Sequence, residues 1–302
     1  MGGENDLTME VAVPRTLDEG FQSLLDSVTP DGSELDAVGS YREEIRECLD
    51  SNFGLYAFFL GGSFLNDTGI AGYSSVDYFA SVDDAGLPSD STLFLDEVGR
   101  ALDERFPDAG VTVRAPAVAV PLGAGASDTV RVIPARLAGQ TGAGHRVYEI
   151  ADGAGGWMKS SPDGHSARIA VVDRELGGRL RPLVRLLKAW RYLRDVPISS
   201  FYLELRCVEY AAGEKMIVYP VDLRNVLELL WDDQFGDMYD VEGVSGRVSA
   251  RLARVDRKMA VSRLRTALYH IGRADDAAAE GNMEETFQYW NRVFNGRFPP
   301  YG

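Results

Sequence analysis

Residues 61–82 read GGSFLNDTGIAGYSSVDYFASV, and this stretch decides the fold that the sequence predicts. It follows a short apolar run, Leu55–Leu60, which is typical of a buried strand. Gly62 and Ser63 suit a loop around phosphate, because glycine lets backbone N–H groups come close and the serine hydroxyl adds a donor. Val76–Val82 then predicts a second strand, and it carries Asp77. The segment therefore indicates a site for the phosphates of a nucleotide.

The second strand is where metal ligands would be expected. Alternation along a strand places Ser75 and Asp77 on the same face. In two-metal phosphoryl transfer, carboxylates on one face bridge two Mg²⁺ ions, which neutralise the triphosphate. A pair of carboxylates two residues apart suits this task, and a third normally comes from a neighbouring strand. Here only Asp77 is acidic, because a serine stands at the first position.

Composition narrows the class of protein and of partner. The chain has 302 residues, of which 45% are hydrophobic and 25% charged, as in ordinary soluble globular proteins of one or two domains. Its net charge of −15 argues against stable binding to DNA or RNA, although a local cationic pocket could still bind a small nucleotide. No apolar run is long enough to span a bilayer, and no signal sequence opens the chain. We therefore expect a cytoplasmic protein without a membrane partner.

The remaining patterns divide the chain into two unlike halves. Thr16 with Glu19 has the spacing of a capping box, which predicts a first helix, and Ser33 opens a second amphipathic helix. Helical and strand patterns then alternate, residues 135–164 predict loops with one strand near 146–150, and helical patterns dominate from Leu176 onward. We expect a flexible terminus at 1–14, an α/β core with N-terminal helices at 15–165, and a helical C-terminal domain at 166–302.

The order of these motifs carries a family resemblance. The pattern Gly62-Ser63-x4-Thr68-x6-Ser75-x-Asp77 resembles that of the polymerase-β-like nucleotidyltransferases, specifically the bacterial cGAS-like, SMODS-type enzymes called CD-NTases. These enzymes have an oligoadenylate-synthetase-like helical C-terminal half. Three further segments strengthen the resemblance: VRVIPA at 130–135, WMKSSPDGH at 157–165, and LRPLVRLLKAWR at 180–191 followed by ISSFYLE at 198–204. The resemblance implies an α+β fold, with a mixed sheet in a polymerase-β-like core and a C-terminal helical bundle.

The resemblance also implies a reaction and a set of nucleotide-binding residues. Its members make cyclic or linear oligonucleotide signals from nucleoside triphosphates in antiphage defence, with Mg²⁺ as cofactor. By this resemblance Gly62, Ser63 and Thr68 belong to the phosphate loop, Lys188 touches the nucleotide, and Ser200 lies near the triphosphate. Two other residues have alternative interpretations: Tyr202 is either a base-stacking or a core residue, and His165 either a catalytic base or structural.

The departures from the family fall on the metal site. Ser75 stands at the first carboxylate position and Arg131 at the third, so Asp77 is the one matched ligand, a weak site for Mg²⁺. A guanidinium that faces Asp77 would pair with it and take the place of the cation. Other carboxylates could take the place of the missing ligands: Asp67 in the loop, Asp128 on the opposite strand face, and Asp83 and Asp84 after the strand.

Two functions follow, together with one weaker alternative. We expect a CD-NTase-like protein of bacterial antiphage signalling that is catalytically impaired and binds a nucleotide, or a protein partner from a defence operon. The main alternative is an active Mg²⁺-dependent synthase of oligonucleotide second messengers, and a weaker one is a transferase with another substrate. Arg181, Arg185 and Lys188 share one face of a predicted helix. That face would either contact phosphates or be a solvated basic surface.

Overall fold

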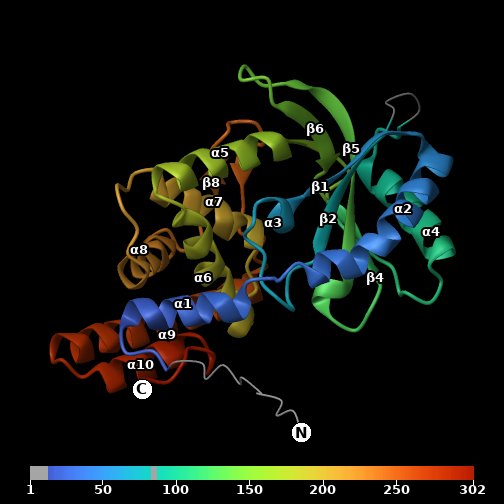
Figure 1. Cartoon of the computed structure of the whole chain (residues 1–302). Helices are drawn as coiled ribbons and strands as arrows, with labels where there is room; N and C mark the ends of the chain where they lie inside the picture. The colour runs from blue at the N-terminus through green and yellow to red at the C-terminus, as the bar shows by residue number, and fades with distance from the viewer. Residues whose placement is uncertain (1–12, 83–86) are drawn as a thin grey trace, which may run out of the picture.

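A seven-stranded mixed sheet forms the core of the first half of the molecule (Figure 1). Its main path runs β1-β2-β5-β4-β3; β6 pairs with β5, and β7 with β6. The β2–β5 pair is parallel, whereas the other pairs are antiparallel. The strands are β1 (Leu55–Gly61), β2 (Val76–Val82), β3 (Thr112–Arg114), β4 (Ala117–Pro121), β5 (Thr129–Gln140), β6 (Arg146–Ala151) and β7 (Trp157–Ser160).

This computed structural model describes residues 13–82 and 87–302. The expected flexible terminus at 1–14 therefore lies almost wholly outside the described residues, as do Asp83 and Asp84. Within the described ranges, no helix is long and apolar enough to cross a membrane.

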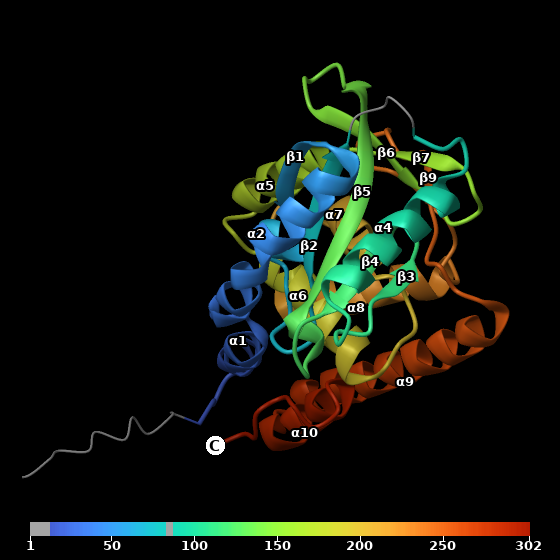
Figure 2. The same ribbon diagram turned by 90° about the vertical axis from the view of Figure 1, so that its right-hand side faces the viewer.

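Two helices, α2 (Ser33–Phe53) and α4 (Ser91–Arg105), cover one face of the sheet (Figure 2). The alternation predicted for β2 is observed. Val76, Tyr78, Ala80 and Val82 are buried in the core that these helices share with the sheet. Asp77 therefore lies on the other face, which looks toward the second half of the molecule. The sequence thus fixes which side of the sheet carries the candidate site.

The second half is helical, as the sequence predicts. Its hydrophobic core contains buried side chains from helices that are far apart in the chain. These helices are α5 (Pro162–Glu175), α6 (Leu180–Leu193), α7 (Ser200–Ala211), α8 (Tyr219–Asp232), α9 (Arg254–Ala279) and α10 (Met283–Val293), with a small ribbon of β8 (Met238–Tyr239) and β9 (Arg247–Val248) between α8 and α9.

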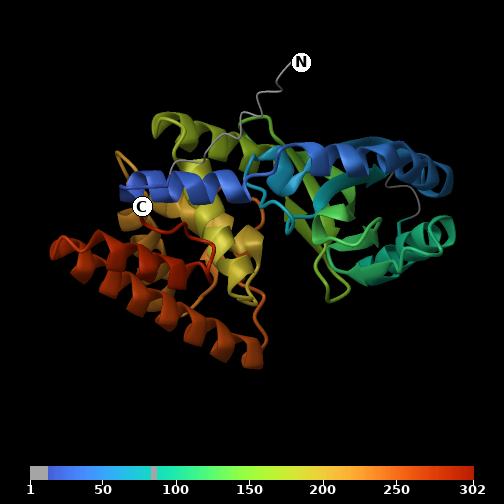
Figure 3. The ribbon, with the colours of Figure 1, turned by 60° about the horizontal axis from the view of Figure 1, so that its bottom comes forward.

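The first helix, α1 (Leu17–Val28), begins at the predicted capping box, but it packs against the helical half (Figure 3). The ring of Phe21 lies 4.8 Å from that of Trp290 and 5.1 Å from that of Phe298. The sequence groups this helix with the α/β core, because its periodicity shows an apolar face but not the surface that the face covers. Residues near the two ends of the chain therefore pack together.

The junction between the two halves holds more regular structure than the sequence predicts. β5 continues to Gln140, β7 forms within the expected loops, and α5 begins at Pro162, well before Leu176. Ser161 caps α5 through a hydrogen bond to the backbone N–H of Gly164. The glycines of this region mark turns between strands. They do not make one long loop.

Candidate functional site

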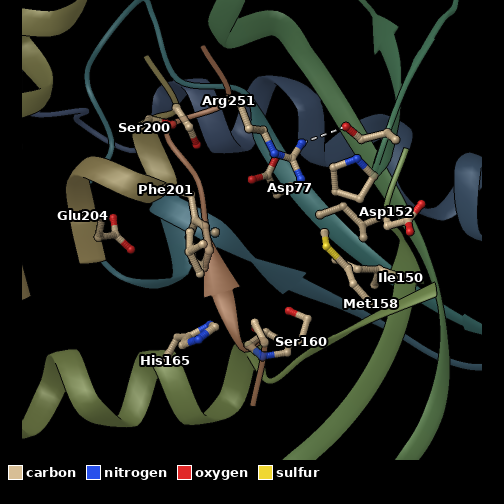
Figure 4. Close-up of a pocket in the computed structure, with 18 of the residues that line it drawn as sticks. Asp77, Ile150, Asp152, Met158, Ser160, His165, Ser200, Phe201, Glu204 and Arg251 are labelled. Carbon is tan, nitrogen blue, oxygen red and sulfur yellow. Dashed lines mark hydrogen bonds between the residues drawn. The ribbon is translucent and has the colours of Figure 1, made fainter. Parts of the chain in front are cut away.

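A cavity of about 630 Å³ lies between the open face of the sheet and the helical half (Figure 4). Both halves line it, and so does the segment from β9 to α9. Its charged lining consists of five basic side chains (Arg114, Arg131, Lys159, Arg247 and Arg251) and three carboxylates (Asp77, Asp152 and Glu204), besides His165. The whole chain has a net charge of −15, but the lining of this cavity has more positive than negative side chains.

The phosphate-loop glycine lies directly against the candidate metal ligand. Gly62 has a φ of +62°, and a Cβ at this position would stand 2.3 Å from Oδ2 of Asp77. Only glycine combines this conformation with so close an approach. The structure thus brings Gly62 and Asp77 together at the cavity wall, whereas Ser63, in the short helix α3 (Gly62–Leu65), is not among the lining residues.

Asp77 is paired with the arginine that stands at the third carboxylate position. The two residues are register partners on β2 and β5, and Nη1 of Arg131 lies 3.2 Å from Oδ1 of Asp77. The Asp77 side chain is 16% exposed and that of Arg131 37%. Burial raises the pKa of the Asp77 carboxyl, and the positive charges of Arg131 and Lys188 and a hydrogen bond with Ser75 only partly oppose this rise.

Two of the carboxylates considered as substitutes, Asp67 and Asp128, are held by other contacts. Asp67 forms an ion pair with Arg185, and its side chain is 71% exposed. Asp128 accepts a hydrogen bond from the backbone N–H of Gly125 at 2.8 Å. Across residues 13–82 and 87–302, no group of three or more His, Cys, Asp or Glu side chains could hold a metal ion. The residues around Asp77 therefore do not fit Mg²⁺, which needs several oxygen ligands.

Lys188 and Thr68 belong to a buried network behind the cavity wall. The Lys188 side chain is 3% exposed; it pairs with Glu204 and donates to Oγ1 of Thr68 at 2.9 Å. Glu204 also accepts from Thr68 at 2.6 Å and from Asn66 at 2.8 Å. Burial alone would raise the pKa of Glu204, but the Lys188 charge and these hydrogen bonds outweigh it and hold the pKa below its ordinary value. The network ties the loop to α6 and α7.

Arg181 and Arg185 use the same face of α6 to hold the loop. Nε of Arg181 donates to the carbonyl oxygen of Asn66 at 2.9 Å, and Arg185 pairs with Asp67. The basic face that the sequence identified is therefore neither a solvated surface nor, in this structure, a lining of the cavity. Its contacts with phosphate stay a prediction.

The start of α7 supplies the aromatic surface of the cavity, but not through Tyr202. Tyr202 is fully buried, and its hydroxyl donates to the carbonyl oxygen of Gly236 at 2.7 Å, so its ring has no free face for a base. Phe201, one residue earlier, is 42% exposed and lines the cavity beside Ser200. Sequence reasoning missed Phe201, because a shift of one residue on a helix selects a different face.

His165 lines the cavity from α5, and its ring is oriented by a residue that the sequence did not single out. Nε2 of His165 lies 2.7 Å from Oδ1 of the buried Asp240. Asp240 also accepts backbone hydrogen bonds from residues 242, 244 and 245. Burial opposes ionisation of Asp240, but the hydrogen bond and charge of His165 and these N–H groups hold its pKa far below the ordinary value. These contacts fit the structural interpretation of His165.

Comparisons with known proteins agree with this architecture. A probable cyclic nucleotide synthase of Bacillus cereus is 25% identical over 177 residues, which are 56% of this chain and 51% of that protein. The chain thus matches about half the length of this curated relative. No protein-family model matches the chain.

Solved structures match over a larger share of the chain. Escherichia coli CdnC, in a complex with a HORMA protein, has a TM-score of 0.68 and 18% identity, covering 92% of this chain and 96% of that one. A cyclic dinucleotide synthase, CdnE of Elizabethkingia meningoseptica, was solved with GTP and has a TM-score of 0.58 and 22% identity, covering 83% of this chain and 98% of that one. The α+β fold, with its polymerase-β-like core and C-terminal helices, is therefore that of the CD-NTase structures.

Proposed function

We propose that this chain is a CD-NTase nucleotidyltransferase whose metal site is degenerate, and that it binds a nucleotide without turning it over. The fold, the sequence match to a probable cyclic nucleotide synthase and the order of the motifs support the family. Fold alone does not settle activity, since function depends on the residues of the site.

The ion pair between Asp77 and Arg131 is the observation that carries the proposal. A two-metal mechanism needs carboxylates free to bind cations on the cavity face of the sheet. Here the matched carboxylate faces a guanidinium 3.2 Å away, and Ser75 supplies only a hydroxyl at the neighbouring position. The two halves of the pair neutralise each other, so the position offers little attraction for a divalent cation.

The rest of the cavity favours binding of a nucleotide. Its volume of about 630 Å³ falls within the range of ordinary small-molecule sites, roughly 300–1,000 Å³. Phe201 offers an aromatic surface to a base, and Ser200 adds a hydroxyl. Arginines on the sheet side supply positive charge for phosphates.

The proposed biological role and protein partner rest on similarity alone. The Escherichia coli CdnC structure is a complex with a HORMA protein. We therefore also propose a cytoplasmic role in bacterial antiphage signalling, with a partner protein from the same defence operon.

A turnover assay tests the proposal against an active synthase. The full chain is incubated with radiolabelled nucleoside triphosphates and Mg²⁺ or Mn²⁺, and nucleotide binding is measured in parallel by calorimetry. We expect binding with little or no product. Robust turnover that disappears in Asp77→Asn would refute the degenerate site and establish the Mg²⁺-dependent synthase.

A further inference from the structure

Three arginines from distant parts of the chain line the same cavity as Asp77. Arg131 comes from β5, Arg114 ends β3, and Arg251 lies in the segment between β9 and α9. Nη1 of Arg251 donates to the carbonyl oxygen of Ala115 at 2.9 Å, which holds this guanidinium beside the end of β3. Figure 4 shows this hydrogen bond as a dashed line from the Arg251 guanidinium.

The positive charge of this cluster exceeds its negative charge. Asp77 pairs with Arg131, and within residues 13–82 and 87–302 no carboxylate forms an ion pair with Arg114 or Arg251. Asp152, the other carboxylate on this side, accepts backbone hydrogen bonds from residues 154 and 156. Among the described residues, Arg114 and Arg251 thus have no carboxylate as an ion-pair partner.

The arginines also lie close enough to repel one another. Burial lowers the pKa of Arg251, and the positive charges of Arg131 and Arg114 lower it further. Gathering like charges at a cavity wall costs free energy, and an anion that enters the cavity would relieve this repulsion.

We propose that Arg114, Arg131 and Arg251 form a metal-independent site for the polyphosphate group of a nucleotide, in which guanidinium groups take the place of Mg²⁺. Guanidinium is suited to this role, because its planar donors pair with two phosphate oxygens at once and its charge does not titrate. The inference rests on the proposed function and deepens it by naming the form of the ligand: free polyphosphate, not its magnesium complex.

A consequence separates this site from a two-metal site. Mg²⁺ bound to a triphosphate removes two negative charges and covers oxygens that the arginines would contact. The described part of the chain has no set of carboxylates to receive the ion in exchange. Mg²⁺ should therefore weaken binding, whereas in a metal-dependent site it would strengthen it.

The test uses the full chain and inorganic tripolyphosphate, with binding measured by calorimetry in EDTA and again with excess Mg²⁺. We expect binding in EDTA and a several-fold loss of affinity with Mg²⁺. Arg114→Gln and Arg251→Gln should each weaken binding in EDTA by about tenfold, the effect of losing one charge-assisted contact. Arg265→Gln, which removes the same charge from an exposed site on α9, should change affinity less than about twofold.

Two further variants keep the test decisive if a glutamine variant unfolds. Arg114→Lys and Arg251→Lys retain the charge but lose the forked donor, and they should weaken binding by a smaller factor than glutamine. Binding of tripolyphosphate only with Mg²⁺, or arginine variants that bind as tightly as Arg265→Gln, would overturn the inference. A nucleotide that binds with Mg²⁺ but is not turned over would leave the proposed function standing. Turnover would refute the proposed function, but it would not change the interpretation of tripolyphosphate binding in EDTA.

Discussion

Asp77 and Arg131 are register partners on the parallel strands β2 and β5, and their side chains meet at 3.2 Å on the cavity face of the sheet. Partners in a parallel pair point to the same side, so the residue at 131 necessarily faces the carboxylate at 77. An acidic residue there would complete a metal site. Arginine instead completes an ion pair. The strands thus have the arrangement expected of a metal site, but the side chain at position 131 is not a metal ligand.

Restoring the acidic residues should create a response to Mg²⁺. We expect Ser75→Asp combined with Arg131→Asp to bind Mg²⁺, because three carboxylates would then share one face. At ten times its Kd, Mg²⁺ should stabilise this variant by about 1.4 kcal/mol, or roughly 2 °C in a thermal scan. Ser75→Asn with Arg131→Asn is the matched control and should not respond. An equal shift in the unmodified protein would contradict our account of the site.

Gly62 should not tolerate a side chain. Gly62→Ala places a Cβ 2.3 Å from Oδ2 of Asp77 at a φ of +62°, so we expect a loss of about 1–3 kcal/mol in the free energy of unfolding. Gly39→Ala is the control: it lies within α2, has no atom within 4 Å of the added Cβ, and should stabilise by about 0.5–1 kcal/mol. Urea unfolding measures both. Equal effects of the two substitutions would contradict the crowding at Gly62.

The sequence predicted those parts of the site that depend on local pattern. Strand alternation placed Asp77 on its face, and the motif order implied that Arg131 would stand opposite. It could not place Arg114 and Arg251, which are 137 positions apart and meet only through packing of the β9–α9 segment against β3. It also could not choose between Phe201 and Tyr202, because the choice depends on which face of α7 meets the core.

For Lys188, the sequence predicted the helix face but not the contacts of that face. Its place on the basic face of α6 was predicted, but two partners of that face, Asn66 and Asp67, belong to a loop over 110 positions away. A cationic stripe in a sequence does not say whether phosphates or backbone carbonyls will occupy it. The signal for α5, by contrast, was present: Ser161 followed by Pro162 is a typical helix start. The surrounding glycines obscured it.

The buried network should be sensitive to the loss of its cation. Lys188→Met leaves Glu204 buried without its charge partner, so we expect a loss of about 3–5 kcal/mol in the free energy of unfolding. Lys258→Met removes the same charge from an exposed position on α9 and should change stability by less than about 0.5 kcal/mol. Adding Glu204→Gln to Lys188→Met should recover part of the loss. A loss below about 1 kcal/mol in Lys188→Met would show that the ion pair does not stabilise the fold.

Acid should unfold the protein partly through Glu204 and Asp240. Both pKa values lie below their ordinary values of 4.5 and 3.8, so the stability they contribute is complete above those values. It is lost as the pH falls through the lower pKa of the folded state. We expect the free energy of unfolding, measured in urea, to decline from about pH 5 downward. Glu204→Gln should flatten this decline, whereas the exposed Glu97→Gln should leave it unchanged; equal slopes would contradict the assignment.

The aromatic surface of the cavity should contribute to binding of the base and not of the phosphates. Phe201 is 42% exposed, and its ring packs edge-on against that of His165, 5.3 Å away, so its cavity side is open to a base. Stacking on one aromatic ring contributes about 1–3 kcal/mol, so Phe201→Ala should weaken ATP binding by about 5- to 150-fold. The same variant should bind inorganic tripolyphosphate as the parent does. Tyr56→Ala, which removes an exposed ring from β1, should change neither affinity. Calorimetry with both ligands checks this, and a parallel loss of tripolyphosphate binding would mean that Phe201 supports the shape of the whole cavity instead of contacting a base.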